Sequence, residues 1–370
     1  MLIYLARYAH ILGPLRLFQY LSVRTALAVL ISLLVSLLIG PAFIRALKRF
    51  SISQDETKEA LDFHQHKEGT PTMGGLMVVG VICLSMLFCG NFENRFIPLV
   101  LLTTIGLAAI GFIDDYLKLI ESPKGLSGRS KILGQLLVAL SIGAALYIRP
   151  VEAGRLWLSE PARPENGLML TVPFFKNILL PLGIFYIPLV VLVLIGSSNA
   201  VNLTDGLDGL AAGCTLACSV ALAGLTYLVG NVKFSSYLNV MYVRGAGELT
   251  VFLGAVIGAL VGFLWFNTYP AEVFMGDTGS LALGGVLGTV AILAKQELLL
   301  VIIGGVFVLE ALSVILQVGS YRLRGKRIFR MAPLHHHFEL KGWPEPKVIV
   351  RFWIMAFVLS LAAVATLKLR

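Results

Sequence analysis

Charge is what this sequence lacks most. Only 14% of its 370 residues are Asp, Glu, Lys or Arg, whereas 57% are apolar, and the mean hydropathy is +0.84. A soluble globular domain usually carries about 25% charged residues. The composition therefore predicts a protein that lies in a lipid bilayer rather than a water-soluble domain. The net charge of +9 suits a surface near anionic lipid headgroups, and we expect no nucleic-acid partner.

Cysteine is also scarce, and the placement of the cysteines argues against disulfide bonds. The four cysteines lie inside apolar runs, which favours packing over disulfide or zinc chemistry. They are Cys83, Cys89, Cys214 and Cys218. The chain has no repeat of fixed period and no low-complexity tract. The first apolar run lacks a small-residue cleavage site and continues into Arg45, Lys48 and Arg49, so we expect a retained anchor.

Long apolar runs, by contrast, are abundant. A helix needs about 20 apolar residues to cross a bilayer, and spanning segments must pair their own backbone groups. Ten segments qualify or nearly do so: 24–44, 74–90, 96–113, 132–148, 178–196, 209–229, 248–266, 279–294, 298–320 and 350–368. No connection is long enough for a separate soluble domain. The sequence predicts an all-α polytopic membrane protein, a bundle of about ten transmembrane helices in one domain, 1–370.

The connections between these spans differ in chemistry. Alternate connections lie on the same side of the membrane, and all seven aspartates fall on the first, third, fifth and seventh: Asp55, Asp62, Asp114, Asp115, Asp205, Asp208 and Asp277. Three consecutive histidines, His335 to His337, lie on the ninth. We therefore predict one polar site at one face. Lysines and arginines divide too evenly for the positive-inside rule to orient the chain, although YRLRGKRIFR in the ninth connection favours a cytoplasmic location.

The third connection opens with GFIDDYLKL. On a helix, Lys118 shares a face with both Asp114 and Asp115, while the two carboxylates point about 100° apart. One carboxylate can then pair with the lysine while the other meets a substrate. Carboxylates at the membrane edge cost free energy unless they are paired or bind a metal, which favours function over a simple interface cluster. Lys131, farther along, extends a basic stretch that suits phosphates.

The fifth connection carries NAVNLTDGLDGL. The spacing predicts that Asp205 and Asp208 share one face of the first turn of a helix, with Asn202 on the same face. A helix N-terminus stabilises carboxylates, but capping explains only one of them. The three side chains therefore predict a surface for a polar ligand or a hydrated magnesium ion.

Two further connections suit anions and a metal. The first contains HKEGTPTMGG, in which Lys67 precedes a turn and two glycines that admit a close anion, although a plain helix-entry turn has a similar pattern. The seventh reads FNTYPAEVFMGDTGS. Asp277 stands at the entrance of a span, and hard cations such as Mg²⁺ prefer one or two carboxylates. Asn267 and Phe274 could meet a base and its sugar, although Phe274 could equally pack at the membrane interface.

The ninth connection contributes MAPLHHHFELKGWPEP. Three adjacent histidines cannot all face one way, so a zinc site is a poor fit. Proton exchange or hydrogen bonding to phosphate near neutral pH suits His335, His336 and His337 better, and a chance histidine-rich turn is the alternative.

These five motifs, in this order, resemble one family over essentially the whole chain. KEGTPTMGG, GFIDDYLK, NAVNLTDGLDGL, FNTYPAEVFMGDTGSLALGG and APLHHHFELKGWPEP are similar to the polyprenyl-phosphate N-acetylhexosamine-1-phosphate transferases. The last motif points to their phospho-N-acetylmuramoyl-pentapeptide transferase branch. The resemblance implies transfer of phospho-N-acetylmuramoyl-pentapeptide from its UDP-linked donor to undecaprenyl phosphate, with Mg²⁺ as cofactor. It also implies a bacterial cytoplasmic membrane, with the odd connections cytoplasmic and both termini periplasmic.

The resemblance also implies residue roles. Asp277 is expected to bind the magnesium ion, and at least one of Asp114 and Asp115 to deprotonate or position the lipid phosphate, with Lys118 nearby. A covalent phospho-aspartate is the alternative. The nucleoside pocket is expected to comprise Asn202, Asp205, Asp208, Asn267 and Phe274. Phosphate contacts are expected from Lys67 and Lys131, and catalytic contributions from His335, His336 and His337.

Two other functions fit parts of the sequence. A sister transferase would use UDP-N-acetylglucosamine as donor, and an ion-coupled secondary transporter can also have ten helices with broken polar entries. Transporters place ionisable groups near the midplane, where Glu310 is the only acid well inside a predicted span. Glycines 254, 258 and 262 form a stripe that could serve a homodimer, which the family implies, or internal helix packing.

Overall fold

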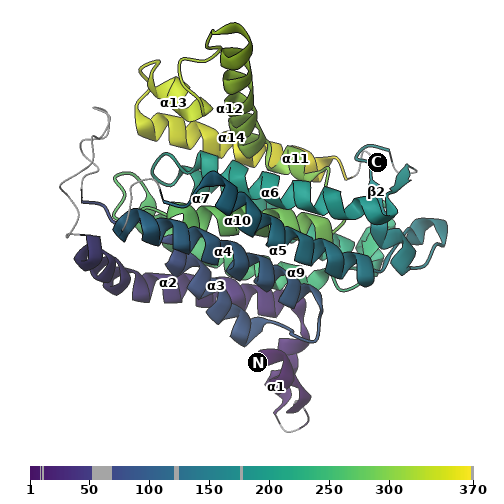
Figure 1. The fold of residues 1–370 in the computed structure, drawn as a ribbon. Helices are drawn as coiled ribbons and strands as arrows, with labels where there is room; N and C mark the ends of the chain where they lie inside the picture. Colours follow the sequence, from purple (N-terminus) through teal and green to yellow (C-terminus); the bar gives the residue numbers. More distant parts are fainter. Residues whose placement is uncertain (9, 11, 52–68, 121–124, 176–177, 368–370) are drawn as a thin grey trace.

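Long helices form almost the whole chain (Figure 1), which confirms the all-α prediction. The computed structural model describes residues 1–370 except 9, 11, 52–68, 121–124, 176–177 and 368–370. Within these residues, nine helices are long and apolar enough to span a membrane, and α3 is a shorter apolar helix of 15 residues. The long helices and α3 are α2 (Leu21–Ser51), α3 (Gly75–Cys89), α4 (Phe96–Ile120), α5 (Gly128–Ile148), α6 (Tyr186–Thr204), α7 (Leu210–Val229), α9 (Gly247–Asn267), α10 (Gly276–Leu293), α12 (Gly305–Arg324) and α14 (Glu345–Ala365).

The remaining elements are short. They are the helices α1 (Leu2–Leu5), α8 (Val232–Leu238), α11 (Leu300–Ile303) and α13 (Leu334–Glu339), and the strands β1 (Ala153–Gly154), β2 (Met169–Thr171), β3 (Leu179–Pro181) and β4 (Tyr242–Val243). The strands pair antiparallel, β1 with β4 and β2 with β3. Apolar-run analysis did not predict them, because two or three residues carry no readable alternation.

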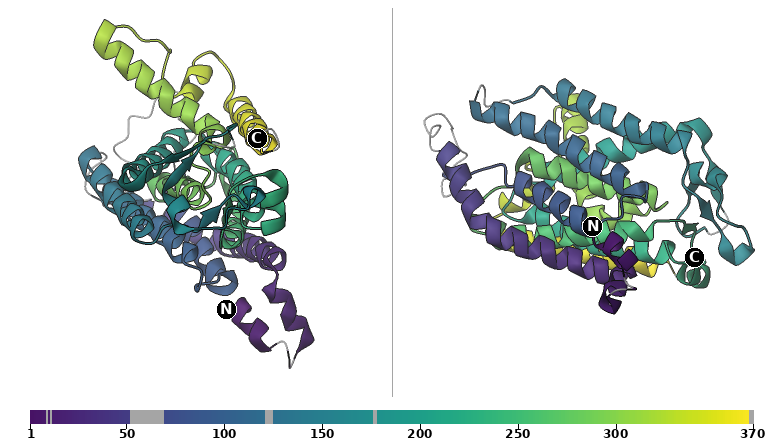
Figure 2. Two further views of the ribbon diagram at one scale, coloured as in Figure 1. Left: turned by 90° about the vertical axis from the view of Figure 1, so that its right-hand side faces the viewer. Right: turned by 90° about the horizontal axis from the view of Figure 1, so that it is seen from below.

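Helix α10 occupies the centre of the bundle, and Figure 2 shows it surrounded when the bundle is viewed end-on. Its small residues allow this close packing. A Cβ at Gly284 would lie 2.4 Å from the backbone oxygen of Ser197 on α6, and one at Gly285 would lie 2.0 Å from a methyl group of Leu107 on α4. The first turn of α10, which carries Asp277, is therefore fixed between α4 and α6.

The glycine stripe of α9 faces α2 of the same chain. A Cβ at Gly258 would lie 2.2 Å from the backbone oxygen of Val29, and one at Gly254 would lie 2.9 Å from that of Thr25. Of the two roles that the sequence left open for this stripe, the structure shows internal helix packing. A homodimer stays a prediction, and it would need a surface other than this stripe.

Two predicted spans differ most from the observed helices. The predicted span 178–196 corresponds to α6, which begins at Tyr186 and continues through the polar NAVNLT to Thr204. Hydropathy ended it early because these polar side chains face the protein interior rather than lipid. The predicted span 298–320 is two helices, α11 and α12, which are separated at Gly304. Beyond this break α12 turns away from the bundle (Figures 1 and 2), and mainly its first half is buried.

The two ends of the bundle carry different elements, as the alternation of connections predicts. The strands and the end of α14 lie at one end (Figure 1). The N-terminal amine donates to the carbonyl oxygens of Leu87 and Phe88, where α3 approaches its end. The polar motifs lie at the other end. This arrangement sets the position of the site.

Candidate active site

A cavity of about 410 Å³ opens at the polar end of the bundle. The first, third, fifth and seventh connections contribute to its walls. The ninth connection approaches the wall at Gly206 through His335. The sequence-predicted residues Asp115, Lys118, Asn202, Asp205, Asp208, Asn267, Phe274 and Asp277 all line it. Lys67 lies outside the described residues. In the part of the chain that the structure describes, four of the five odd connections therefore meet at one polar cavity.

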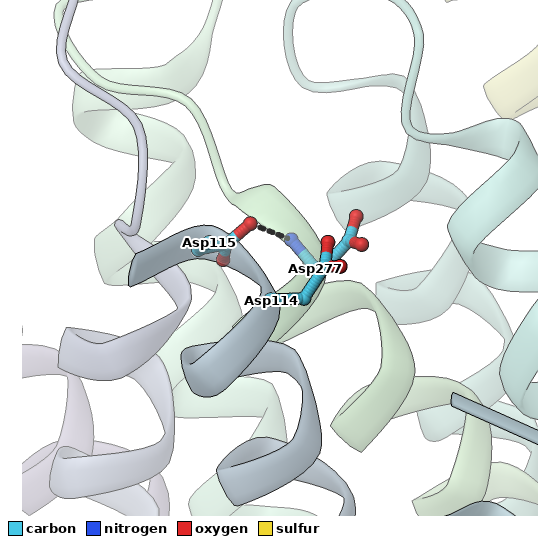
Figure 3. Close-up of side chains that lie close together, drawn as sticks. All are labelled: Asp114, Asp115 and Asp277. Atoms are coloured by element: carbon cyan, nitrogen blue, oxygen red, sulfur yellow. Dashed lines mark hydrogen bonds between the residues drawn. The ribbon is translucent and has the colours of Figure 1, made fainter. Parts of the chain in front are cut away.

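Asp115 joins the end of α4 to the start of α10 (Figure 3). Its Oδ1 accepts a hydrogen bond from the backbone N–H of Asp277 (3.1 Å), and its Oδ2 accepts from the backbone N–H (2.9 Å) and hydroxyl (2.8 Å) of Thr278. These are N–H groups of the first helical turn, which have no partner within the helix. The side chain of Asp115 is only 3% exposed, so both oxygens are committed to α10.

Asp114 and Asp277 share two lysines. Lys118 Nζ lies 2.5 Å from Asp114 Oδ2 and 3.0 Å from Asp277 Oδ2. Lys131 Nζ lies 2.8 Å and 2.5 Å from the same two oxygens. Asp114 Oδ1 also accepts from the backbone N–H of Leu126 (2.7 Å), and its side chain is fully buried. The predicted pairing of Lys118 with one aspartate of the pair is confirmed: it is Asp114.

Asn202 fixes the second oxygen of Asp277. From the last turn of α6, its side-chain Nδ2 donates to Asp277 Oδ1 (2.8 Å) and to the Ser280 hydroxyl (2.9 Å). Asp277 is thus held from α4, α5 and α6 at once, while its side chain keeps 15% exposure toward the cavity. Its position is set by tertiary contacts rather than by α10 alone.

The three carboxylates form a cluster that could hold a metal ion. One oxygen each from Asp114, Asp115 and Asp277 lies within 4.8 Å of the other two (Figure 3). Three carboxylates beside two ammonium groups leave one net negative charge. Oxygen ligands suit a hard cation, and the uncompensated charge favours binding one. The residues present therefore fit a divalent metal ion.

The turn between α6 and α7 corrects one sequence prediction. Asp205 and Asp208 do not lie on the first turn of a helix, because α6 ends at Thr204 and α7 begins at Leu210. Gly209, with a φ of 74°, reverses the chain between them, which a residue with a side chain rarely allows. Asn202 belongs to the preceding helix, so the three side chains reach the cavity from a helix end and a tight turn.

The electrostatics of this turn are unusual. Burial raises the pKa of Asp205 to about 7, and the nearby charges of Asp277 and Asp115 add to the rise, against a hydrogen bond from the Gly276 backbone. Asp208 has a different task. Its Oδ2 accepts from the backbone N–H of Ala271 (3.0 Å), which ties the turn to the segment that carries Phe274.

Asn267 and Phe274 lie on that seventh connection. The side-chain Nδ2 of Asn267 donates to the carbonyl oxygen of Val273 (2.8 Å), so this donor holds the segment. Phe274 is half-buried, and its backbone N–H donates to the carbonyl oxygen of Pro71 (2.8 Å) on the first connection. These bonds explain how two distant connections form one wall of the cavity.

The three histidines separate. His335 is buried, with Nδ1 3.2 Å from Glu310 Oε1, whereas His336 Nδ1 lies 2.7 Å from Glu339 Oε2. His337 Nδ1 accepts from the backbone N–H of Arg330 (3.0 Å). Burial lowers the pKa of His337, and the nearby charges of Lys341 and Arg330 lower it further. Among the described residues, no candidate metal cluster includes these histidines. His335 lies against the cavity wall, with Nε2 beside Gly206.

Sequence reasoning missed three contributors. Thr278 and Ser280 follow Asp277 at the entrance of a span. That position was the one feature of the sequence that could have indicated that their hydroxyl groups contact the site residues. Glu310 was noted as a lone acid within a span, but nothing in its own segment indicates that it bonds to His335, 25 residues later.

Comparison with known proteins identifies relatives. The sequence profile of glycosyl transferase family 4 matches residues 97–295. The chain is 51% identical over 361 residues, 97% of each chain, to a phospho-N-acetylmuramoyl-pentapeptide-transferase of Thermodesulfovibrio yellowstonii. Proteins of the same name from Citrifermentans bemidjiense and Pelobacter propionicus are each 50% identical over 369 residues, 98% of this chain and 99% of theirs.

Proposed function

The chain belongs to glycosyl transferase family 4, among the phospho-N-acetylmuramoyl-pentapeptide transferases, and we propose that it works at the cytoplasmic face of the bacterial inner membrane. The donor is UDP-N-acetylmuramoyl-pentapeptide and the acceptor is undecaprenyl phosphate. An oxygen of the acceptor phosphate attacks the phosphorus that carries the sugar. The bond from this phosphorus to the bridging oxygen breaks, and its electron pair leaves with UMP. The products are a lipid-linked diphosphate sugar, lipid I, and UMP.

The observation that carries this proposal is the cluster of Asp114, Asp115 and Asp277 at the point where the odd connections meet. Two phosphorylated substrates repel each other, so the site needs positive charge that is fixed in place. Lys118 and Lys131 supply it, because each is held by two carboxylates. The cluster lies at the end of the bundle, where a cytosolic donor and a membrane-bound acceptor can both arrive.

Mg²⁺ is the proposed metal, with Asp277 as its principal ligand beside Asp114 and Asp115. When bound, the ion neutralises phosphate charge and stabilises the charge that develops during transfer. Asn202 orients Asp277 for this task through its hydrogen bond to Oδ1. Asp115 acts by fixing the first turn of α10, on which Asp277 stands.

The nucleoside is proposed to lie along the wall formed by the fifth and seventh connections. Phe274 stacks on the uracil. Asn267 and Asp208 hold the segment that presents it through hydrogen bonds to backbone atoms of that segment. Asp205 completes the wall. Lys67, by family resemblance, contacts phosphate.

Direct transfer is the proposed route rather than a phospho-aspartate. Asp115 has both oxygens engaged by donors of α10, and Asp114 is bonded to Leu126 and two lysines. A nucleophile needs a free oxygen pointing at the phosphorus. The crowded state of both carboxylates supports positioning roles. Release of UMP by protein and donor alone, without acceptor, would refute the direct route.

The experiment that tests the function uses purified protein, the UDP-linked donor, undecaprenyl phosphate and detergent, with Mg²⁺ or with EDTA. We expect lipid-linked product only with the metal, and a loss of about 100-fold or more in Asp277→Ala, the size seen when a fixed electrostatic partner is removed. Glu165→Ala is the matched control, because it removes an exposed carboxylate near the strand-bearing end. Turnover with UDP-N-acetylglucosamine instead would favour the sister transferase.

A further inference from the structure

A carboxylate inside a membrane span lies directly beneath the histidine motif. Glu310 stands in the second turn of α12 and its side chain is fully buried. Ionisable groups at such positions are costly, and their retention needs a partner and a reason. The roles proposed above do not use this residue.

Within the described residues, the hydrogen-bond partners of the Glu310 carboxylate lie at the start of α13. Its Oε2 accepts from the backbone N–H of Leu334 (2.6 Å), and its Oε1 accepts from the backbone N–H of His335 (3.2 Å). The His335 ring adds Nδ1, also 3.2 Å from Oε1. One carboxylate therefore receives two backbone donors and a ring nitrogen.

This geometry assigns the ring proton. An ionised carboxylate can only accept, and as a carboxylate Glu310 accepts a backbone N–H at each oxygen. The nitrogen of His335 that faces Oε1 must then carry a hydrogen, which places the proton on Nδ1. Nε2 is left as the nitrogen that is free to meet another group.

Nε2 points at the cavity wall. A Cβ built on Gly206 would lie 2.4 Å from it, and Gly206 lines the cavity between Asp205 and Asp208. Nε2 is buried and has no hydrogen-bond partner among the described residues, and the ring as a whole is 1% exposed. The other sides of the ring face Glu310 and the ring of His336, 4.2 Å away between centroids. Gly206 is the neighbour of Nε2 that borders the cavity, so the cavity is the direction from which a partner can reach this nitrogen.

We propose that Glu310 is a positioning residue: it holds His335 with the proton on Nδ1, and thereby directs Nε2 past Gly206 to an oxygen of the phosphorylated substrate. The inference rests on the proposed transferase function and deepens it, because it selects one histidine of the three and one atom of that ring. A carboxylate that fixes a histidine tautomer is a known device for keeping the opposite nitrogen ready. Gly206 is part of the device, since any side chain there would occupy the place of Nε2.

The test compares kcat and KM of Glu310→Gln, His335→Ala and the double variant in the lipid-product assay. The amide keeps the shape but replaces one acceptor oxygen with a donor. We expect kcat of Glu310→Gln to fall about 10- to 100-fold, as for other orienting partners, with KM for the donor within about twofold. In the His335→Ala background, Glu310→Gln should cause no further loss. Additive losses would mean that Glu310 acts through something other than His335 and would overturn the proposal.

A matched control and a second variant separate positioning from folding. Glu339→Gln removes the carboxylate that faces Nδ1 of His336, whose ring does not line the cavity, and should change kcat less than twofold. Gly206→Ala should lower kcat in the wild-type background but cost nothing further in His335→Ala, where the clashing ring is gone. Equal losses in both backgrounds would show that Gly206 does not act by leaving room for His335 Nε2.

The wild-type protein offers a measurement that does not depend on the activity of any variant. With ¹⁵N-labelled histidine, the His335 signals, assigned by their loss in His335→Ala, should show a protonated Nδ1, and the Nε2 signal should shift when the UDP-linked donor is added. A neutral ring protonated only on Nε2 would overturn the proposal. If the wild-type chain makes no lipid-linked product at all, the proposed function fails, whereas active wild-type protein with additive variants defeats only the positioning role.

Discussion

Asp115 and Thr278 join two helices that are far apart in the sequence. The carboxylate near the end of α4 accepts both the backbone N–H and the hydroxyl of Thr278 on the first turn of α10. This contact sets the distance between Asp114, one residue before Asp115, and Asp277, one residue before Thr278. The geometry of the carboxylate cluster therefore depends on the contact between Asp115 and Thr278.

Asp115→Asn is expected to impair both stability and activity. An amide offers one acceptor oxygen to three donors, so at least one buried donor loses its partner, at a cost of about 1–3 kcal/mol in the free energy of unfolding. Activity should fall about 100-fold or more because Asp277 moves relative to Asp114. Thermal unfolding in detergent and the lipid-product assay measure the two effects.

Thr278→Ser and Thr278→Val serve as graded comparisons for this contact. Serine keeps the hydroxyl that donates to Asp115 and should retain most activity, while valine removes it at nearly constant volume. Valine that matches the wild type in both assays would show that the hydroxyl bond contributes nothing to the cluster.

Lys131→Met is expected to tighten metal binding while lowering turnover. In the metal-free site, three carboxylates face two ammonium groups, and removing one ammonium adds a negative charge to the cluster. The missing charge lies 2.5 Å from Asp277 Oδ2, so Mn²⁺ affinity should rise about 10-fold even with strong screening. Binding can be followed by electron paramagnetic resonance, and kcat should fall because the phosphates lose a cation.

Lys131→Arg keeps the charge and is the control for this prediction. Its Mn²⁺ affinity should stay near that of the wild type, although its longer, planar head group can still disturb turnover. Weaker Mn²⁺ binding in Lys131→Met would show that the lysine supports the metal site rather than competing with the ion.

The sequence predicted the helix bundle well because each transmembrane helix can be identified from its own residues alone. Twenty apolar residues identify a transmembrane helix whatever surrounds it, and the ten predicted segments all correspond to helices of the described chain. Helix ends were less accurate. The last turns of α6 are polar because they face Asp277 and Ser280 across the protein interior, and a hydropathy window cannot distinguish such residues from a loop.

The site was predictable as a set of residues but not as a set of contacts. Aspartates on alternating connections, together with the family motifs, identified most of the side chains that line the cavity. That Asp115 binds α10 while Asp114 binds two lysines depends on helix rotation and packing, which adjacent residues cannot reveal. The bond between Glu310 and His335 likewise depends on where α13 folds back onto α12.

Asp205 should make stability depend on pH. Its pKa is about 7 in the folded, metal-free protein and near 3.8 when unfolded, so the folded state holds more protons between these values. Stability therefore falls as pH rises from about 4 to 7 and stays lower above it. Asp205→Asn removes this dependence. The unfolding temperature of the variant, relative to that of the wild type, should therefore increase as pH rises. A constant difference between the two proteins from pH 5 to 8, measured in EDTA, would contradict the raised pKa.

Gly258→Leu should unfold the protein rather than change its oligomeric state. Any side chain at this position meets the backbone of α2, because a Cβ would lie 2.2 Å from the carbonyl oxygen of Val29 and 2.9 Å from the Cβ of Ser32. Backbone cannot rotate away as a side chain can, so α2 and α9 must separate, and forced separation of packed helices typically costs about 1–3 kcal/mol or more.

Gly224→Ala is the matched control for the stripe. It also lies in a span, on α7, but a Cβ there meets no atom within 4 Å, and alanine favours helix by about 1 kcal/mol over glycine. We expect a normal unfolding temperature for Gly224→Ala and a sharply lower one for Gly258→Leu, with size-exclusion profiles in detergent that show no shift between oligomeric forms in the folded fraction. A well-folded Gly258→Leu protein with altered oligomeric state would mean that the stripe faces a second copy of the chain, and that the contact between α2 and α9 is weaker than the packing indicates.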